Sequence, residues 1–248
     1  MSRPLNLGIV AGEASGDMLG ARVIKAFRAR YPALEVHGVG GPAMEAAGLH
    51  SHFSMERLAV NGLVEPLRRL PELLSLRTDL LRMFRAAPPD VFLSIDAPDF
   101  NLWLARKLRA SGVPTAHLVS PSVWAWRRSR LRGIARAVDM MLCLFPFETD
   151  IYRQYGIPVR CVGHPLADEL AVPLHRDDAR GELGLDAPRP VLALLPGSLA
   201  AEVAALAPLF LRCARLLSTD NPGLAVVIPA SSLERRAQLE LLASEFPE

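Results

Sequence analysis

The feature that most constrains the fold is a regular alternation of short apolar runs with longer amphipathic stretches. Strands are predicted at residues 5–10, 34–39, 91–95, 115–119, 140–144 and 159–162. Helical patterns lie between them, at residues 17–30, 67–86, 100–110 and 148–155. Unbroken apolar strands that alternate with helices predict an α/β protein whose parallel sheet is covered on both faces. Ligands of such sheets bind at the carboxyl ends of the strands.

The pattern breaks once and then resumes. Residues 171–190 are rich in charge, Gly and Pro, which is typical of a linker with room for one short helix. Strands are predicted again at 191–195 and 224–228, with helices at 201–217 and 233–244. Two strands and two helices do not complete a doubly wound sheet. We therefore expect a Rossmann-like domain over 1–170, a linker over 171–190 and the first part of a second such domain over 191–248.

Composition excludes several other classes of protein. Half of the 248 residues are hydrophobic, so the chain is not a disordered one. A formal net charge of +2, from 28 basic and 26 acidic residues, is too balanced to indicate a nucleic-acid partner. Cys143, Cys161 and Cys213 show no metal or disulfide spacing, so we expect them buried and reduced. No signal peptide or membrane span is recognisable, which predicts a cytoplasmic location.

The loop after the first strand reads VAGEASGD and ends in a helix. Gly12 and Gly16 permit a tight turn and a close ligand approach, and Ser15 or Asp17 can cap the helix. A helix N-terminus attracts anions, yet Glu13 would repel a phosphate here. The loop therefore favours hydroxyl recognition or acid–base chemistry, with an ordinary capped turn as the alternative.

A second glycine-rich turn follows the second strand, at GVGGPAM. Gly38, Gly40 and Ala43 nearly match a dinucleotide-binding fingerprint, but the match follows the wrong strand and Pro42 interrupts it. A structural turn is the better interpretation.

Two carboxylates and an amide gather at the end of the third strand, in SIDAPDFN. Asp99 fits the N-cap of the next helix, and Asn101 follows it. Asp96 has no such local role, which makes it the better candidate for a general base. A carboxylate that only accepts hydrogen bonds from neighbouring backbone N–H groups is the alternative.

Three further segments carry candidate binding residues. SPSVWAWRRSR joins tryptophans, which stack on sugar rings, to arginines, which bind phosphate; solvated arginines on a helix are the alternative. Residues 64–85 mix leucines with arginines, as in a helix that lies on an anionic membrane, although packing on the sheet is commoner. LLPGS leads to a helix N-terminus that can hold a diphosphate, but it has no lysine and is not a Walker loop.

Taken together, these segments resemble the lipid-A-disaccharide synthases, glycosyltransferases of the two-Rossmann-domain GT-B type. The resemblance is carried by AGEASGD at 11–17, GVGGPAM at 38–44, IDAPDFN at 95–101, SPSVWAW at 120–126, GHP at 163–165 and LLPGS at 194–198. It implies transfer of 2,3-diacylglucosamine from UDP to 2,3-diacylglucosamine 1-phosphate, with inversion. The products are the β(1→6) disaccharide of lipid A biosynthesis and UDP, and no metal or redox cofactor is implied.

The resemblance also implies roles for individual residues. Asp96 acts as the base, and Glu13 positions the acceptor or shares the proton. Other substrate contacts are expected from Gly12, Ser15, Gly16, Asp17, Asp99, Asn101, Ser120, Trp124, Trp126, Arg127 and His164. The donor diphosphate is expected at Gly197, Ser198 and Glu202. Docking to the cytoplasmic face of the inner membrane is expected from Leu67, Leu70 and Leu74.

Two departures from the family pattern keep alternatives open. Leu199 stands where the family has an arginine, and a leucine cannot neutralise a diphosphate. The family also continues well beyond residue 248. The alternatives are a truncated, non-catalytic remnant that binds acylated sugar phosphate or membrane, and a nucleotide-sugar epimerase on a related fold.

Overall fold

A computed structural model describes residues 3–58, 70–170, 175–185 and 189–245. The chain divides into two compact units, Met1–Glu169 and Leu170–Glu248. Within the described residues, no helix is long and apolar enough to cross a membrane.

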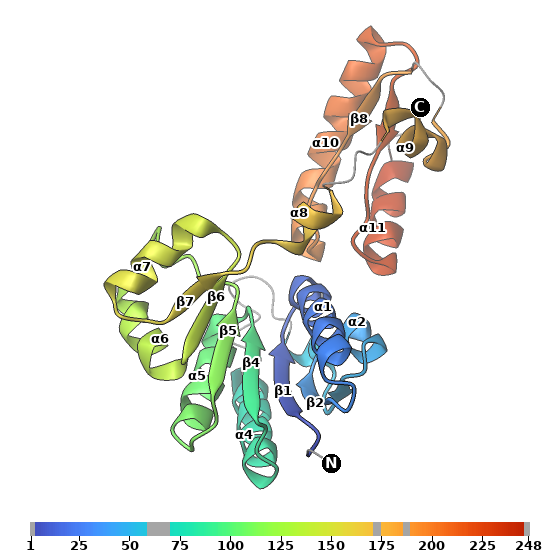
Figure 1. Cartoon of the computed structure of the whole chain (residues 1–248). Helices are drawn as coiled ribbons and strands as arrows, with labels where there is room; N and C mark the ends of the chain where they lie inside the picture. The colour runs from blue at the N-terminus through green and yellow to red at the C-terminus, as the bar shows by residue number, and fades with distance from the viewer. Residues whose placement is uncertain (1–2, 59–69, 171–174, 186–188, 246–248) are drawn as a thin grey trace. The chain divides into compact units, whose positions relative to one another are not determined.

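The larger unit is built on a parallel sheet of seven strands (Figure 1). The order across the sheet is β3-β2-β1-β4-β5-β6-β7. In chain order the strands are β1 (Asn6–Ala11), β2 (Glu35–Val39), β3 (His50–Ser51), β4 (Val91–Ile95), β5 (Thr115–Leu118), β6 (Met140–Cys143) and β7 (Val159–Cys161). The α/β class predicted from the alternation is confirmed.

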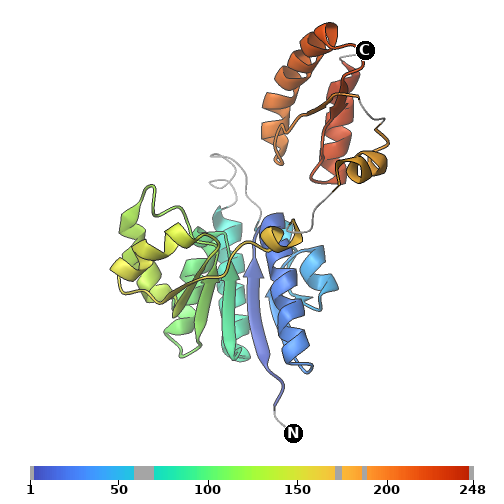
Figure 2. The same ribbon diagram turned by 45° about the horizontal axis from the view of Figure 1, so that its top comes forward.

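Helices cover both faces of this sheet, as the two views in Figures 1 and 2 show. One face carries α1 (Ala14–Arg30) and α2 (Pro42–Ala46). The other carries α4 (Leu70–Ala86), α5 (Pro98–Arg109), α6 (Leu131–Ala137) and α7 (Thr149–Gln154). Short 3-10 turns at Met55–Arg57, Arg128–Arg130 and Pro146–Glu148 and the helix α8 (Pro165–Glu169) complete the unit.

Neighbouring residues of each strand pack into two separate hydrophobic cores, because side chains along a strand alternate between the two faces of the sheet. Val10 and Phe92 pack among the helices α4 to α7. Ile9 and Leu93 pack on the side of α1 and α2. The apolar runs are continuous because both faces of the sheet are covered.

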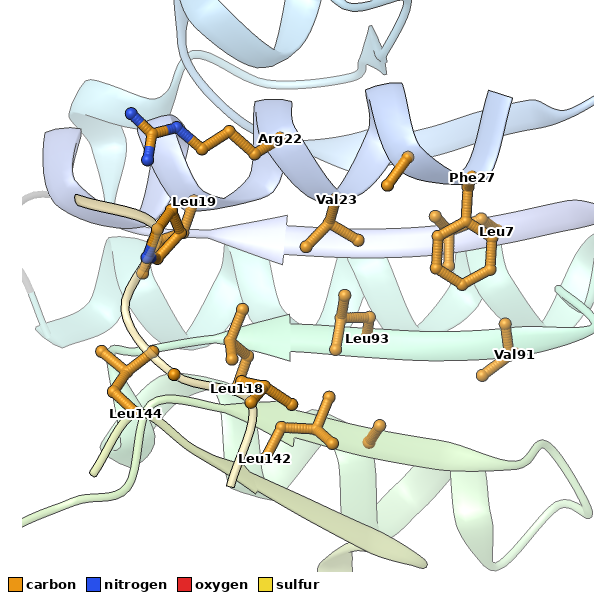
Figure 3. Close-up of a pocket in the computed structure, with 15 residues that line it drawn as sticks. Leu7, Leu19, Arg22, Val23, Phe27, Val91, Leu93, Leu118, Leu142 and Leu144 are labelled. Atoms are coloured by element: carbon orange, nitrogen blue, oxygen red, sulfur yellow. The ribbon is translucent and has the colours of Figure 1, made fainter. Parts of the chain in front are cut away.

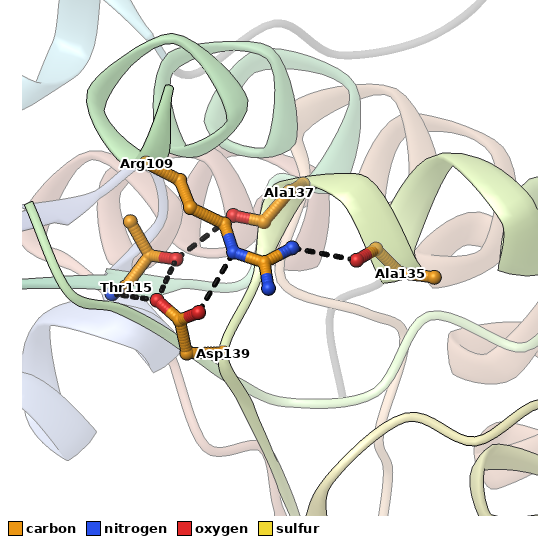
Figure 4. Close-up of polar contacts among 5 residues, drawn as sticks. All are labelled: Arg109, Thr115, Ala135, Ala137 and Asp139. Carbon is orange, nitrogen blue, oxygen red and sulfur yellow. Dashed lines mark hydrogen bonds and ion pairs between the residues drawn. The ribbon is translucent and has the colours of Figure 1, made fainter. Parts of the chain in front are cut away.

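A polar network joins α5, β5 and β6 (Figure 4). Arg109 donates from Nε to Asp139 Oδ1 at 2.7 Å, and from Nη1 to the carbonyl of Ala135 at 2.7 Å. Asp139 also accepts from the backbone N–H and the hydroxyl of Thr115, at 2.9 and 3.2 Å. Burial opposes the charge on Asp139, but the hydrogen bonds from Thr115 and Arg109 outweigh it and lower the pKa of the carboxyl. The network fixes α5 against the strands on this side of the sheet.

An apolar groove of about 400 Å³ runs beside α1 on its face of the sheet (Figure 3). Leu93, Leu118 and Leu142 form its floor, with Val23 and Phe27 of α1 along one side. None of the residues predicted as catalytic or substrate-binding lines this groove. The predicted catalytic and substrate-binding residues therefore lie outside this groove.

The smaller unit is a parallel pair of strands packed with helices. Its elements are α9 (Arg176–Glu182), β8 (Val191–Ala193), α10 (Ala200–Asp220), β9 (Ala225–Val227) and α11 (Leu233–Ser244). Val203, Ala207 and Leu239 are buried between α10 and α11, and Leu194 packs with Leu211.

The observed elements agree with the predicted ones to within about three residues at each end. The prediction missed the two-residue strand β3 and the short helices α2, α6 and α8. Part of the predicted helix 67–86 lies outside the described residues. The expectation of buried cysteines is wrong for Cys161 and Cys213, which are exposed.

Candidate active site

The sheet topology places one crevice at the carboxyl ends of β1 and β4. The chain leaves β1 through α1 toward β2, and leaves β4 through α5 toward β5, on opposite faces of the sheet. Strands that part in this way form the point at which open α/β sheets bind ligands. Glu13 follows β1 and Asp96 follows β4, and the last paired residues of the two strands are Ala11 and Ile95.

Gly12 lets the loops after β1 and β4 approach each other closely. A Cβ atom on Gly12 would lie 3.0 Å from the Cβ of Ala97, which is tighter than ordinary contact. A Cβ on Gly16 would lie 3.5 Å from Ile95. Packing therefore favours glycine at position 12 but not at position 16, where the contact would be an ordinary one, and the substrate contacts expected of both stay a prediction.

The loop that carries Asp96 is held in a strained conformation. Asp96 and Ala97 have φ angles of 50° and 42°. Asn101 donates from Nδ2 to the carbonyls of Ile95 and Asp96, at 3.2 and 2.8 Å. Because Asn101 is fully buried, its expected role in substrate binding is replaced by one in positioning Asp96.

Asp99 does not cap α5. The N-cap residue is Ala97, and Asp99 lies in the first turn, where it is exposed and paired with Arg130. The cap predicted from the sequence is wrong because the helix begins at Pro98, two residues before the predicted start at Phe100.

A cavity of about 340 Å³ opens beside Asp96. It brings together three predicted site residues besides Asp96, namely Ser120, Trp126 and Arg127. The remaining lining residues are Pro98, Val119, Pro121, Ser122, Val123 and Arg130. Sequence reasoning did not single out Arg130 for binding, although it lies in the same arginine run.

Backbone strain is concentrated at this cavity. In the described part of the chain, four residues other than glycine have φ angles in the left-handed region: Asp96, Ala97, Val119 and Arg127. Three of them line the cavity, and Ala97 adjoins Asp96. Val119, at 77°, is the most costly, because a β-branched side chain disfavours this conformation. Strain of this kind persists where surrounding structure enforces it, and it is common at functional sites.

The charges at the site are of both signs. Burial of its carboxyl, and then the charge of Asp96, raise the pKa of Glu13, although the residue as a whole is exposed. A raised pKa makes the carboxylate of Glu13 a stronger base than that of an ordinary glutamate. Arg127 and Arg130 supply positive charge beside Asp96 in the cavity.

The tryptophans take different positions. Trp126 lines the cavity, and the guanidinium of Arg127 lies over its ring at 4.2 Å. Trp124 does not line the cavity; its ring meets Phe147 edge-on at 5.3 Å, and both residues are exposed. Ser120 is buried, with its hydroxyl 2.7 Å from that of Tyr152.

Asp17 has a structural role that the sequence did not reveal. Its carboxylate accepts hydrogen bonds from the backbone N–H groups of Gly41, Ala43 and Met44, at 2.9 to 3.0 Å. The prediction that Ser15 or Asp17 caps α1 is wrong, because no side chain forms a cap hydrogen bond there. Asp17 is buried and caps α2 instead, so it is not available to a substrate.

The glycine-rich turn before α2 is built for packing. A Cβ on Gly38, whose φ is 152°, would lie 1.7 Å from the carbonyl oxygen of Ile9. The N–H groups that could hold a phosphate are bonded to Asp17. The structure favours the structural interpretation over a dinucleotide site.

Several predicted residues lie outside the cavity. His164 accepts from the backbone N–H of Leu166 at 3.2 Å and so caps α8. Ser15 is exposed at the start of α1. Leu70 and Leu74 are exposed on α4, and Leu67 lies outside the described residues.

In the smaller unit, the predicted diphosphate turn is occupied by its own side chain. The N–H groups of Ser198 and Leu199 donate to Glu202 Oε2, at 3.2 and 3.3 Å. Gly197 has a φ of 117° and packs against the same side chain. A carboxylate therefore lies where the negative charge of a diphosphate was expected.

A separate cluster of side chains suits a metal ion. His37, His50 and His52 are the group of potential ligands found within the described residues, with one ligand atom of each lying within 4.8 Å of the others. Partial burial and the two neighbouring imidazoles lower the pKa of His52. Sequence reasoning missed this cluster because His37 lies 13 residues before His50 and its pairing with the segment of His50 and His52 is not visible in the sequence.

Comparison with known proteins identifies the family. The family model described as lipid-A-disaccharide synthetase matches residues 7–248. The chain belongs to this family. The resemblance seen in the sequence motifs is thereby confirmed.

Curated relatives named lipid-A-disaccharide synthase agree with this assignment. Those of Pseudomonas aeruginosa strain LESB58 and Hahella chejuensis are 54% and 50% identical to this chain. The matches cover 97% and 96% of the chain, but 64% and 60% of the relatives. The chain thus spans under two thirds of their length.

Solved structures share the fold at low sequence identity. The Staphylococcus aureus MnaA–UDP co-structure matches with a TM-score of 0.63 at 10% identity, covering 98% of this chain and 66% of that one. UDP-GlcNAc 2-epimerase from Neisseria meningitidis, bound to UDP-GlcNAc, matches with a TM-score of 0.62 at 10% identity, covering 99% and 71%. These likenesses confirm the GT-B-like fold class, and at such identity they carry no argument for epimerisation.

Proposed function

We propose that this chain carries the acceptor site and the catalytic base of an inverting glycosyltransferase that makes lipid A disaccharide 1-phosphate. The donor is UDP-2,3-diacylglucosamine and the acceptor is 2,3-diacylglucosamine 1-phosphate. The observation that carries the proposal is the position of Asp96. It follows β4 and lines a cavity with Arg127, Arg130 and Trp126, beyond the carboxyl ends of β4 and β5. Family membership supplies the substrates.

The reaction needs one base. Asp96 removes the proton from the 6-hydroxyl of the acceptor, and the oxygen attacks the anomeric carbon of the donor from the face opposite UDP. The new C–O bond forms as the bond from that carbon to the diphosphate breaks, so UDP leaves with the electron pair and the configuration inverts. Asn101 serves as a positioning residue, because it fixes the backbone of Asp96.

Glu13 assists at the same crevice. Burial and the neighbouring Asp96 raise the pKa of its carboxyl, and we propose that this side chain positions the acceptor or shares its proton.

The arginines of the cavity suit the acceptor phosphate. Arg127 and Arg130 present planar donors that match phosphate oxygens in pairs. Trp126 offers an exposed ring on which a sugar can stack. The guanidinium of Arg127 forms a cation–π contact with this ring.

Donor binding in the smaller unit requires a rearrangement. A diphosphate can use the N–H groups of Ser198 and Leu199 only after the Glu202 carboxylate leaves them, because both are anions. Leu199 cannot offset the charge, so we expect a weakly held donor.

The test is release of UDP by the full chain supplied with both acylated sugars. Asp96→Asn should lower the rate by about 10²–10⁴-fold, the usual contribution of a general base. The matched control is Asp150→Asn, an exposed carboxylate on α7 that pairs with Arg153 and does not line the cavity, which should keep most of the rate.

The outcomes separate the alternatives. Normal turnover by Asp96→Asn would exclude it as the base. If the unmodified chain binds acceptor but releases no UDP, the non-catalytic alternative is favoured. In that case Arg127→Ala should still weaken acceptor binding, since the acceptor site does not depend on turnover.

A further inference from the structure

The edge of the sheet farthest from β7 carries three histidines that the proposed transfer does not use. We propose that His37, His50 and His52 form a binding site for one divalent transition-metal ion, with Zn²⁺ as the fitting example. None of the three lines the cavity beside Asp96.

The backbone places the three rings on one face of the sheet. His37 of β2 and His50 of β3 are directly paired residues in parallel strands. The N–H of His52 donates to the carbonyl of Gly38 at 2.9 Å, which continues the pairing past the end of β3. Since side chains alternate along a strand, His50 and His52 point to the same side, the side of His37.

The geometry is close to that of a metal site. The ring centroids of His50 and His52 lie 4.7 Å apart, and each lies 5.7 to 5.8 Å from that of His37. One nitrogen of each ring lies within 4.8 Å of the others. Tetrahedral Zn²⁺ with bonds of about 2.0–2.1 Å needs nitrogens about 3.3 Å apart. Closing that gap takes only small rotations of side chains, and His50 and His52 are exposed and have room to turn.

The donor set selects the kind of ion. Three imidazoles, with no carboxylate or thiolate in the group, suit Zn²⁺, Ni²⁺ or Cu²⁺ and not Mg²⁺ or Ca²⁺, which prefer oxygen ligands. Three protein ligands leave a fourth position for water. The ion would tie the two-residue edge strand β3 to β2, so its expected effect is on stability.

The experiment uses the full chain, stripped with a chelator and titrated with Zn²⁺ in a calorimeter. We expect one saturable ion per chain and a rise in the midpoint of thermal unfolding, because an ion that binds only the folded state stabilises it. Co²⁺ in place of Zn²⁺ should give the visible absorption bands of a tetrahedral nitrogen site.

Variants decide whether this cluster is the site. His50→Gln and His52→Gln should each weaken Zn²⁺ binding by at least about tenfold, and both lie on exposed positions where metal-free stability should not change. His175→Gln is the matched control, an exposed histidine of the other unit, and should bind like the unmodified chain. The proposal would be overturned if the unmodified chain showed no saturable binding, or if His50→Gln and His52→Gln bound Zn²⁺ as tightly as the unmodified chain.

Discussion

His117 lies completely buried on β5, opposite Ser94 of β4. Its Nδ1 is 2.7 Å from the Ser94 hydroxyl, and its Nε2 has no hydrogen-bond partner in the described structure. Burial lowers the pKa of the imidazole to about 4. A proton on this ring would place a charge inside the sheet without compensation.

The buried imidazole makes stability depend on pH. Above about pH 6.5 the ring is neutral in the folded and unfolded chain alike, and it contributes its full stability. As the pH falls from 6.5 toward 4, only the unfolded chain takes up the proton, so the free energy of unfolding should fall by about 1.4 kcal/mol per pH unit, and about 3 kcal/mol in total. Urea unfolding at several pH values measures this slope.

A variant identifies the group responsible. His117→Gln should lose most of the slope between pH 6.5 and 4, whatever its effect on stability at pH 7. His164→Gln, at a less buried position, should retain it. An unchanged slope in His117→Gln would assign the effect to other groups.

At the scale of an element, α4 combines two roles. Leu76, Leu80 and Phe84 are buried against the sheet, as expected of a covering helix. Leu70 and Leu74 are exposed in its first turns. The two interpretations of this leucine-rich segment, packing and membrane docking, therefore apply to different residues of one helix.

Membrane docking can be tested on the exposed leucines. The proposed substrates carry acyl chains, so we expect the chain to sediment with vesicles that contain anionic lipid. Leu74→Glu should reduce the bound fraction several-fold, because it adds a negative charge and removes apolar area. The control is Leu216→Glu, an exposed leucine on α10 of the smaller unit. If the vesicle-bound fraction falls equally in both variants, or in neither, α4 does not dock to the membrane.

Strands and long helices were predictable because the side chains that they bury recur at regular spacings along the sequence. The strand β3 was not, since two residues that include an exposed histidine carry no apolar pattern and pair only through register with β2. Asp96, Trp126 and Arg127, which line one cavity, could be singled out from the sequence because ligands bind at the carboxyl ends of strands in this fold class. Asp17 and Asn101 were misassigned because their hydrogen bonds go to backbone groups of other segments, which a single sequence does not show.

At the scale of the whole molecule, the two units have cores of unequal size. The larger unit buries two clusters, one on each face of its sheet. In the described residues of the smaller unit, Val203, Ala207 and Leu239 form one small cluster, and Leu194, Leu211 and Ala214 form the other. A larger buried apolar area predicts the more stable unit.

The distribution of tryptophan allows the two units to be followed separately. Trp103, Trp124 and Trp126 are the three tryptophans of the chain, and all belong to the larger unit. Leu211→Ala should destabilise the smaller unit by about 2–5 kcal/mol and shift unfolding followed by circular dichroism, but not by tryptophan fluorescence. Leu104→Ala, in the larger core, should shift the fluorescence transition. If Leu211→Ala moves both signals equally, the units unfold as one.

The strand order has a consequence for how the chain folds as it leaves the ribosome. β2 and β3 each add beside the strand made just before, and so do β5, β6 and β7. In the described sheet β4 is the exception, because it pairs with β1 and not with β3, the strand before it in the chain. Leu7 of β1 pairs with Val91 of β4, so the whole segment between these two residues forms a loop when the strands pair. Closing so long a loop is slow and costs entropy before any contact forms. The same closure brings Asp96 to Glu13. A nascent chain therefore acquires its proposed catalytic pair only when β1 pairs with β4 and joins the two halves of the sheet.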